Sequence, residues 1–253
     1  MYTFAAYCPA ETVKSWSCYW CKGSNITVTS VIYDEGTDTS GFVGYDSSHD
    51  ELIVAFRGTV KTSFSNWITD LDFVHYVPYP TALPKVRVHI GFYRAYLNIL
   101  GQLSLALRIS IIMCPTCNKT VYSGHSLGGA LAAIALMDTI YSTNIPQPTP
   151  ILYTFGQPRT GNIEWAKFMQ TLTKSMTRVV HDLDLVPHVP PRSFGFQHVP
   201  TEIWMPDKGT EPYIICDASG EDKKCSDGQT ALSIADHSSY VGLNLTAGKP
   251  YGC

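Results

Sequence analysis

Residues 124–128, Gly-His-Ser-Leu-Gly, place a serine between two glycines in the pattern GxSxG. Residues 119–123, Lys-Thr-Val-Tyr-Ser, precede the pattern and are predicted to form a short buried strand, and an Ala/Leu-rich stretch follows it from Leu127. A strand before such a turn and a helix after it form the nucleophile elbow of serine esterases. The glycines leave room where strand and helix cross, and the helix N-terminus offers free N–H groups beneath a reacting carbonyl. We therefore predict that Ser126 is a nucleophile; the alternative is an ordinary Gly-Ser turn in another α/β protein.

A serine hydroxyl attacks an ester only with help from a histidine base and a carboxylate behind that base. In hydrolases with this elbow the chain order is Ser, then Asp or Glu, then His. His237 is the last of the eight histidines, and Asp184 precedes an apolar Leu-Val-Pro run that would shield it from water. Order therefore favours Ser126, Asp184 and His237 as a catalytic triad. It leaves as rivals the histidines His181, His188 and His198 and the acids Asp182, Asp207 and Asp217.

Elements that could position these residues follow from the apolar pattern. Strands are predicted most clearly at 52–56, 120–123, 151–155 and 176–181, and more weakly at 42–45, 86–89, 202–205 and 213–215. Helices are predicted at 91–113, 127–141 and 162–172. Alternating strands and helices indicate an α/β protein with a central, mostly parallel sheet flanked by helices. The first ninety residues carry strands without strong helices, which suggests an antiparallel start to the sheet.

Composition fits one domain over residues 1–253, since no repeat, low-complexity tract or charged linker interrupts the chain. Apolar residues make up 45% and charged residues 15%, enough for a buried core. A net charge of −3 without a cluster of four Lys or Arg argues against a nucleic-acid partner. The longest apolar stretch, 103–113, contains Ser104, Arg108 and Ser110, so no transmembrane span is expected. Residues 1–20 lack the basic start and apolar core of a signal peptide, and we expect a mature, monomeric chain.

The eight cysteines are an even number, which favours four disulfides and an oxidising compartment. Two C-x-x-C pairs, at 18/21 and 114/117, could instead bind a metal or act in redox chemistry. They are too far apart for a zinc ribbon, and no histidine is close to either in sequence. The second pair follows a helical stretch, whereas a redox pair opens a helix after a strand. We expect structural disulfides, no metal and secretion, in agreement with Asn-x-Thr sequons at Asn25, Asn118 and Asn244.

Motifs along nearly the whole chain resemble the class 3 lipases, the family of the Rhizomucor and Rhizopus fungal lipases. The matching segments lie at 16–21, 56–59, 66–71, 88–92, 124–129, 156–162, 184–188, 194–196 and 236–237. Together they are far more specific than any one alone. The resemblance implies an α/β-hydrolase fold with a short helical lid, at about 61–72, and hydrolysis of acylglycerols without a cofactor.

The same resemblance implies roles for particular residues. It assigns the triad to Ser126, Asp184 and His237, and the oxyanion hole to the backbone N–H groups of Thr59 and Leu127, with the Thr59 hydroxyl assisting. It aligns with the acyl groove of the family Phe73, Val186 and Phe194. It implies the disulfides Cys8–Cys253, Cys18–Cys21 and Cys216–Cys225, whereas Cys114–Cys117 has no counterpart and is expected to be a local loop clamp.

Three departures from the family concern the lid, stability and acyl preference rather than the chemistry. The segment between Gly58 and Asn66 is slightly longer, and the N-terminus is shorter and is expected to lack the first helix of the relatives. Ser238 stands after the catalytic histidine, where an apolar residue is common.

The predicted lid contains one apolar stripe, because Phe64, Trp67, Ile68 and Leu71 fall at i, i+3, i+4 and i+7. Such a stripe usually packs a surface helix on the core. This helix directly follows Thr59, so it could instead cover the active site. Exposing four large side chains to water would cost at most about 6–12 kcal/mol, most of which a lipid surface would remove. We therefore expect interfacial activation.

These features together predict a secreted triacylglycerol lipase that meets its acylglycerol substrate at a lipid–water interface. The nearest alternative is a feruloyl or other carboxylic ester esterase of the same fold, whose lid is more polar and need not move. A non-enzymatic lipid binder would lack a triad member, and none is missing here. A redox protein built on Cys114 and Cys117 is the remaining alternative, which titration of free thiols would test.

Overall fold

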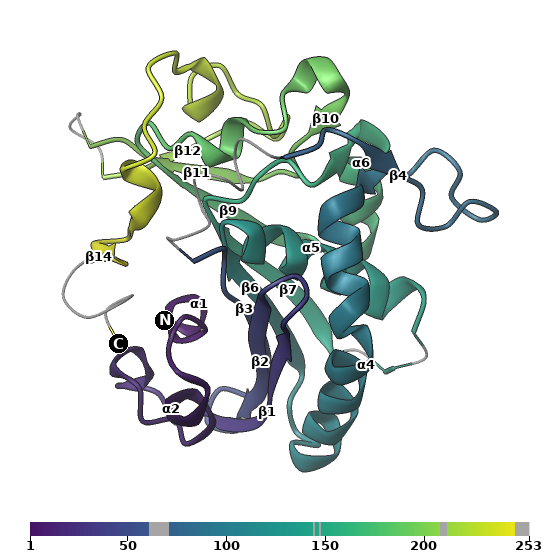
Figure 1. Ribbon diagram of the computed structural model, residues 1–253, viewed down its shortest axis with the longest axis vertical. Helices are drawn as coiled ribbons and strands as arrows, with labels where there is room; N and C mark the ends of the chain where they lie inside the picture. Colours follow the sequence, from purple (N-terminus) through teal and green to yellow (C-terminus); the bar gives the residue numbers. More distant parts are fainter. Residues whose placement is uncertain (61–70, 144, 147, 208–211, 246–252) are drawn as a thin grey trace.

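The computed structural model describes residues 1–60, 71–143, 145–146, 148–207, 212–245 and 253 (Figure 1). A sheet of eight strands runs through it in the spatial order β1-β2-β3-β6-β7-β9-β11-β12. These strands are β1 (Thr27–Asp34), β2 (Thr39–Asp46), β3 (Glu51–Phe56), β6 (Lys119–His125), β7 (Thr149–Phe155), β9 (Ser175–His181), β11 (Glu202–Met205) and β12 (Ile214–Ile215).

The sheet begins antiparallel and continues parallel. β1, β2 and β3 pair antiparallel, whereas β3, β6, β7, β9 and β11 pair parallel in that order. β12 closes the sheet antiparallel to β11. The predicted α/β class, the mostly parallel sheet and its antiparallel start are confirmed.

Helices cover both faces of the sheet. The longer ones are α4 (Ile90–Met113), α5 (Leu127–Tyr141) and α6 (Ile163–Leu172), and two short ones at the N-terminus are α1 (Tyr2–Ala5) and α2 (Ala10–Lys14). α4 and α5 lie on one side of the sheet, and α1 and α2 lie on the other (Figure 1). All three predicted long helices are therefore present.

Strand β3 shows why two cores form. Successive side chains of a strand point to opposite faces. Val54 and Phe56 are fully buried in the core under α4 and α5, whereas Ile53 and Ala55 are fully buried against the N-terminal segment. Because both faces of this strand are covered, it reads as a continuous apolar run rather than an alternating one.

Smaller elements complete the described chain. One four-stranded sheet has the order β10-β8-β5-β4, and β13 pairs with β14. Their strands are β4 (His75–Tyr76), β5 (Val88–His89), β8 (Gly161–Asn162), β10 (Phe196–Gln197), β13 (Ser239–Tyr240) and β14 (Leu243–Asn244). Five 3₁₀ turns are Tyr19–Cys21, Val186–His188, Arg192–Phe194, Ser226–Gly228 and Asp236–Ser238.

All eight cysteines are joined, in the pairs Cys8–Cys253, Cys18–Cys21, Cys114–Cys117 and Cys216–Cys225. These are the three pairs that the family resemblance implies and the local clamp expected at 114–117. The first pair closes a sequence separation of 245 residues and so ties the two ends of the chain together.

One helix among the described residues, α4, is long and apolar enough to cross a membrane by length and composition. The sequence prediction did not anticipate this, because Arg108 lies within the helix. The side chains of Tyr96, Ile99, Leu103 and Leu107 are fully buried in the main core. α4 therefore packs against the sheet as part of the main core.

Candidate active site

Ser126 lies on the turn between β6 and α5, with φ 58° and ψ −132°, which a non-glycine residue rarely adopts. Its N–H donates to the carbonyl of Phe155 at the end of β7 (2.9 Å), and its own carbonyl accepts from Gly129 N–H (2.9 Å) as α5 begins. The residue is 1% exposed, and Ser126 Oγ has no hydrogen-bond partner among the described residues. The turn thus holds a buried hydroxyl that is free to react.

The glycines on each side of Ser126 are required by close backbone contacts. A Cβ on Gly124 would lie 2.0 Å from the carbonyl oxygen of Gly128. A Cβ on Gly128 would lie 2.4 Å from the carbonyl oxygen of Phe56, at the end of β3. A larger residue at either glycine would therefore clash with the backbone, as the GxSxG pattern predicts.

Asp184 and His237 meet beside this turn. Asp184 follows β9 and is fully buried, and its Oδ2 lies 2.8 Å from His237 Nδ1. Its other oxygen accepts the backbone N–H of Val186 at 2.8 Å. The ring of His237 packs against that of His125, the neighbour of the serine, with centroids 4.4 Å apart and the ring planes tilted by 30°. A carboxylate in this place holds the imidazole in one tautomer and orientation.

Gly156 gives this pair its space. It follows Phe155 and has φ +55°, a conformation that glycine adopts without strain. A Cβ there would lie 2.8 Å from Asp184 Oδ2 and 2.9 Å from His237 Cε1. The end of β7 therefore supports Ser126 with one carbonyl and leaves room for Asp184 and His237 with the next residue.

Tyr240 is a third partner of Asp184 that sequence reasoning missed. Its hydroxyl is fully buried and donates a hydrogen bond to Asp184 Oδ2. Burial, reinforced by the charge of Asp184, raises the pKa of the Tyr240 hydroxyl well above 10, so it remains a donor. The tyrosine lies three residues after His237, and nothing in that spacing indicates the contact.

The rival residues lie in other environments. His181 is bonded to the exposed Asp207, and His198 is buried with its Nε2 on the carbonyl of Pro187. Burial, reinforced by Arg178, lowers the pKa of His198 well below 6.5. The remaining rivals are His188, Asp182 and Asp217. Within the described part of the chain, none of them forms a histidine–carboxylate pair near the serine.

The segment that follows β3 passes directly over the serine. A Cβ on Gly58 would lie 2.6 Å from Ser126 Cβ, so only glycine fits there. Thr59 is the next residue after Gly58, and Leu127, the first residue of α5, follows Ser126 directly. Their N–H groups are the predicted oxyanion donors.

A chain of hydrogen bonds connects this segment to His237. The Tyr7 hydroxyl accepts from Gly58 N–H (2.9 Å) and contacts His125 Nδ1 (2.7 Å). His125 Nε2 lies 2.8 Å from the carbonyl of His237, so Nε2 carries the proton. Burial lowers the pKa of His125 well below 6.5, so Nδ1 is unprotonated and accepts from Tyr7. Tyr7, adjacent to the disulfide at Cys8, thus links three segments of the site.

Of the predicted lid, residues 61–70 lie outside the described residues, and with them Phe64, Trp67 and Ile68. Leu71 is partly buried and packs against the main core. A pocket of about 290 Å³ lies beside it, lined also by Leu127, His89 and Arg94. The base of the predicted lid is therefore next to a predicted oxyanion residue.

The three predicted groove residues have different surroundings. The rings of Phe73 and Phe194 pack with centroids 4.8 Å apart, and Phe194 is 53% exposed. Val186 is fully buried, and its N–H supports Asp184. Their contact with an acyl chain stays a prediction.

Arg159 braces the loop that carries Asp184. Its guanidinium bonds both oxygens of Glu221 (2.8 and 2.7 Å) and one oxygen of Asp227 (3.0 Å). On its other side it donates to the carbonyls of His188 (2.6 Å) and Pro190 (3.3 Å). All of these charges are nearly buried, so each depends on the others for compensation.

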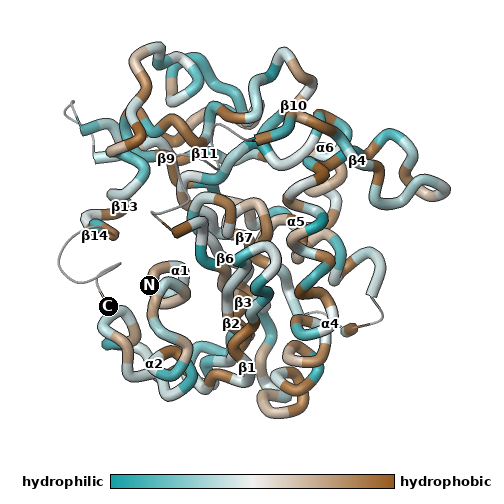
Figure 2. The backbone as a smooth tube through the Cα atoms, in the orientation of Figure 1, coloured by the Kyte–Doolittle hydropathy of each residue, from teal (hydrophilic) through white to brown (hydrophobic). Residues whose placement is uncertain are grey.

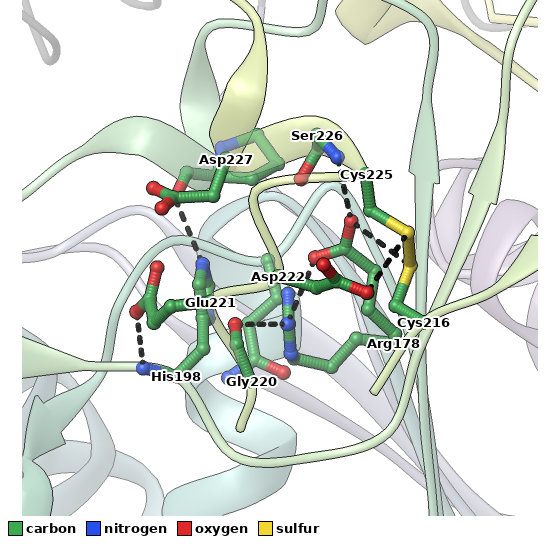
Figure 3. Close-up of polar contacts among 12 residues, drawn as sticks. Arg178, His198, Cys216, Gly220, Glu221, Asp222, Cys225, Ser226 and Asp227 are labelled. Carbon is green, nitrogen blue, oxygen red and sulfur yellow. Dashed lines mark hydrogen bonds and ion pairs between the residues drawn. A yellow bond between two sulfur atoms is a disulfide. The ribbon is translucent and has the colours of Figure 1, made fainter. Parts of the chain in front are cut away.

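A neighbouring cluster fixes the disulfide loop that supplies Glu221 (Figure 3). His198 N–H donates to Glu221, and Arg178 bonds Glu202 and the carbonyl of Gly220. Among the described residues, one group has the spacing of a metal site: Glu202, Cys216 and Cys225. The two sulfurs share a disulfide and Glu202 is held by Arg178, so this group is structural.

The chain is similar in sequence to known lipases. The family model for lipases of class 3 matches residues 53–194. A lipase of Rhizopus oryzae is 35% identical over 94% of this chain, and "Secreted mono- and diacylglycerol lipase 1" of Fusarium solani is 33% identical over 87%. The chain spans 61% and 64% of the lengths of these two relatives.

Solved structures extend the similarity to nearly the whole chain. A structure of the Rhizomucor miehei triacylglyceride lipase is 30% identical and superposes with a TM-score of 0.84, over 96% of this chain and 91% of that one. The family match covers more than half of the chain, and the fold and the elbow agree with it. The chain belongs to the class 3 lipase family.

Proposed function

We propose that this protein is a secreted triacylglycerol lipase that cleaves carboxylic esters through an acyl-enzyme on Ser126. The observation that carries the proposal is the buried Asp184–His237 pair beside a serine on a strained strand-to-helix turn. Four disulfides support secretion, as do the names of relatives described as secreted. We infer that the chain acts as a single domain, as a monomer and without a metal or cofactor.

In the proposed first half-reaction His237 Nε2 takes the proton of Ser126 Oγ as the oxygen attacks the ester carbonyl. Asp184 accepts the hydrogen bond of His237 Nδ1 and stabilises the imidazolium that forms. The N–H groups of Thr59 and Leu127 bind the oxyanion, and loss of one such donor typically lowers the rate about 10²–10³-fold. His237 then returns the proton to the departing alcohol.

In the second half-reaction water replaces the alcohol. His237 removes a proton from water as it attacks the acyl carbonyl, and the same N–H groups hold the second oxyanion. The proton returns to Ser126 Oγ as the fatty acid leaves. His237 and the oxyanion donors thus act in both half-reactions, so one base and one nucleophile are sufficient for the whole reaction.

The predicted lid is one argument for a lipid substrate. Its predicted apolar stripe and the exposed Phe194 next to Phe73 would both meet an apolar surface. We infer interfacial activation: a rate that rises sharply when substrate forms droplets. Relatives differ in substrate by name, since one is a triacylglyceride lipase and another a mono- and diacylglycerol lipase. Triacylglycerol is the substrate we propose.

The deciding experiment measures initial rates by pH-stat on emulsified triacylglycerol, diacylglycerol and monoacylglycerol, dissolved short-chain ester and methyl ferulate. We expect the highest rate on emulsified triacylglycerol, and no hydrolysis by Ser126→Ala although that variant still binds droplets. Activity on partial glycerides alone would replace the substrate. Activity on dissolved or aromatic esters alone would make the protein an esterase without a moving lid.

A further inference from the structure

Thr120 is a buried threonine whose hydroxyl has no partner among the described residues. It is fully buried in β6, opposite Leu52 on one side and Pro150 on the other. Other buried threonines bond theirs, as Thr139 does with Tyr122 and Thr154 with Gln157. A buried polar group without a partner destabilises the fold and calls for an explanation. Valine has nearly the same shape and no polar atom that needs a partner.

A reason for a hydroxyl at this position lies two residues earlier. Asn118-Lys119-Thr120 is an N-glycosylation sequon, which needs Ser or Thr in third place. Asn118 is exposed, and its backbone is fixed: its N–H donates to Asp50 and its carbonyl accepts from Thr149. Its side chain makes no hydrogen bond to the described residues and is available for modification.

The surface next to Asn118 is apolar and lacks a cover. Ile112 is 75% exposed and Met113 58% exposed at the end of α4, which Figure 2 shows as strongly hydrophobic. The Cα atoms of Cys114 and Cys117 are 5.4 Å apart. With about 3.8 Å between consecutive Cα atoms, Met113 and Asn118 lie within about 13 Å of each other. A bulky polar glycan on Asn118 would reach this surface.

We propose that Asn118 is N-glycosylated and that its glycan covers the exposed apolar end of α4. Nδ2 of Asn118 bonds to the anomeric carbon of a lipid-linked oligosaccharide. The bond from that carbon to the polyprenyl diphosphate breaks, the diphosphate leaves with the electron pair, and the amide proton passes to a base of the transferase. This inference rests on the proposed secretion and not on the hydrolytic activity.

The structure distinguishes this sequon from the other two. Asn25 and Thr27 are both exposed, so that sequon is accessible after folding as well. The third, at Asn244, includes Thr246, which lies outside the described residues. Thr120 is buried, so transfer to Asn118 must precede the entry of β6 into the sheet. Asn118 is also remote from the active site, since β6 separates it from Ser126 by roughly 25 Å.

The test uses the full chain secreted from a eukaryotic host, with intact mass and peptide mapping before and after enzymatic deglycosylation. We expect glycan on Asn118 in the parent, Thr120→Ser and Asn25→Gln, and its loss in Asn118→Gln and Thr120→Val. After deglycosylation, Thr120→Val melts about 2–4 °C above the parent, because it lacks the unpaired hydroxyl. Rates on emulsified substrate stay within twofold in all variants.

The covering role has its own readout. Asn118→Gln is expected to bind at least twofold more of a hydrophobic fluorescent dye than the parent and to elute partly as larger species. Adding Ile112→Ser is expected to restore parental values. An unmodified Asn118 in a chain glycosylated at Asn25 would overturn the site. Equal dye binding with and without the glycan would overturn the covering role, and a less stable Thr120→Val would overturn the argument from its hydroxyl.

Discussion

Tyr240 and His237 donate hydrogen bonds to the same oxygen of Asp184. The carboxylate therefore has two donors on Oδ2 and a third, Val186 N–H, on Oδ1. A carboxylate held by three donors has one orientation, which in turn fixes the ring of His237. The triad proposed here thus depends on a tyrosine that does not touch the substrate's reacting atoms.

Tyr240→Phe removes one of these donors and keeps the ring. A hydrogen bond to a charged group contributes about 1.5–3 kcal/mol, so kcat should fall roughly 10–100-fold with little change in KM. Steady-state rates on a dissolved ester, whose concentration is defined, give the measurement. Tyr213→Phe, at a half-exposed tyrosine, is the control and should keep parental rates. An unchanged kcat for Tyr240→Phe would show that two donors suffice.

Acid is expected to destabilise the fold through buried neutral histidines. Burial lowers the pKa of His89 to about 4. Below pH 6.5 His89 binds a proton in the unfolded chain, whereas in the folded chain it stays neutral until about pH 4. The free energy of unfolding therefore falls as the pH is lowered from 6.5 to 4. The loss from this residue is about 3 kcal/mol. Burial lowers the pKa of His125 and His198 as well, in the same direction.

His89→Asn tests this, because asparagine keeps an acceptor for the Phe92 N–H at the start of α4. Urea unfolding at pH 7 and pH 4.5 should show a smaller loss of stability for the variant than for the parent. His49→Asn is the control: Asp46 raises the pKa of His49, so that residue stabilises at acid pH and its removal cannot flatten the loss. Equal losses in His89→Asn and parent would refute the assignment.

The Arg159 cluster should matter for both stability and rate. Glu221→Gln leaves a nearly buried guanidinium short of one charge, a change that typically costs about 3–5 kcal/mol. The melting temperature and kcat should fall together, because Arg159 holds carbonyls of the loop after Asp184. Lys223→Gln removes an exposed partner of Asp227 and should change stability by less than about 1 kcal/mol. A folded Glu221→Gln with parental kcat would restrict the cluster to stability.

The disulfides should differ in their contribution. Loop-closure entropy gives about 5 kcal/mol for Cys8–Cys253, which spans 245 residues, and about 2 kcal/mol for Cys114–Cys117, which spans three. Urea midpoints of the two Cys→Ala double variants give the comparison. Removal of Cys8–Cys253 should also lower kcat, because Tyr7 lies beside it. A larger loss of stability at the short bridge would contradict the entropic account.

The sequence by itself determined the elements whose signals are local. The strand, turn and helix around Ser126 are contiguous, so spacing alone indicated them, and the predicted long helices and inner strands are present. Weak local signals were missed. β1 mixes threonine and serine with valine at a half-exposed edge, and α1 has only four residues, too few for helical periodicity.

Only the tertiary structure decided which distant polar groups meet. Tyr7 and His125 are 118 residues apart, and Arg159 lies 62 residues from Glu221. Two of the donors to the buried Asp184, His237 and Tyr240, lie 53 and 56 residues further along the chain. A buried polar atom needs a hydrogen-bond partner within about 3 Å, and the packing of the chain rather than sequence spacing determines which residue is that partner. The proposed nucleophile could therefore be predicted from the sequence, whereas the contacts that orient the proposed base are decided by the fold.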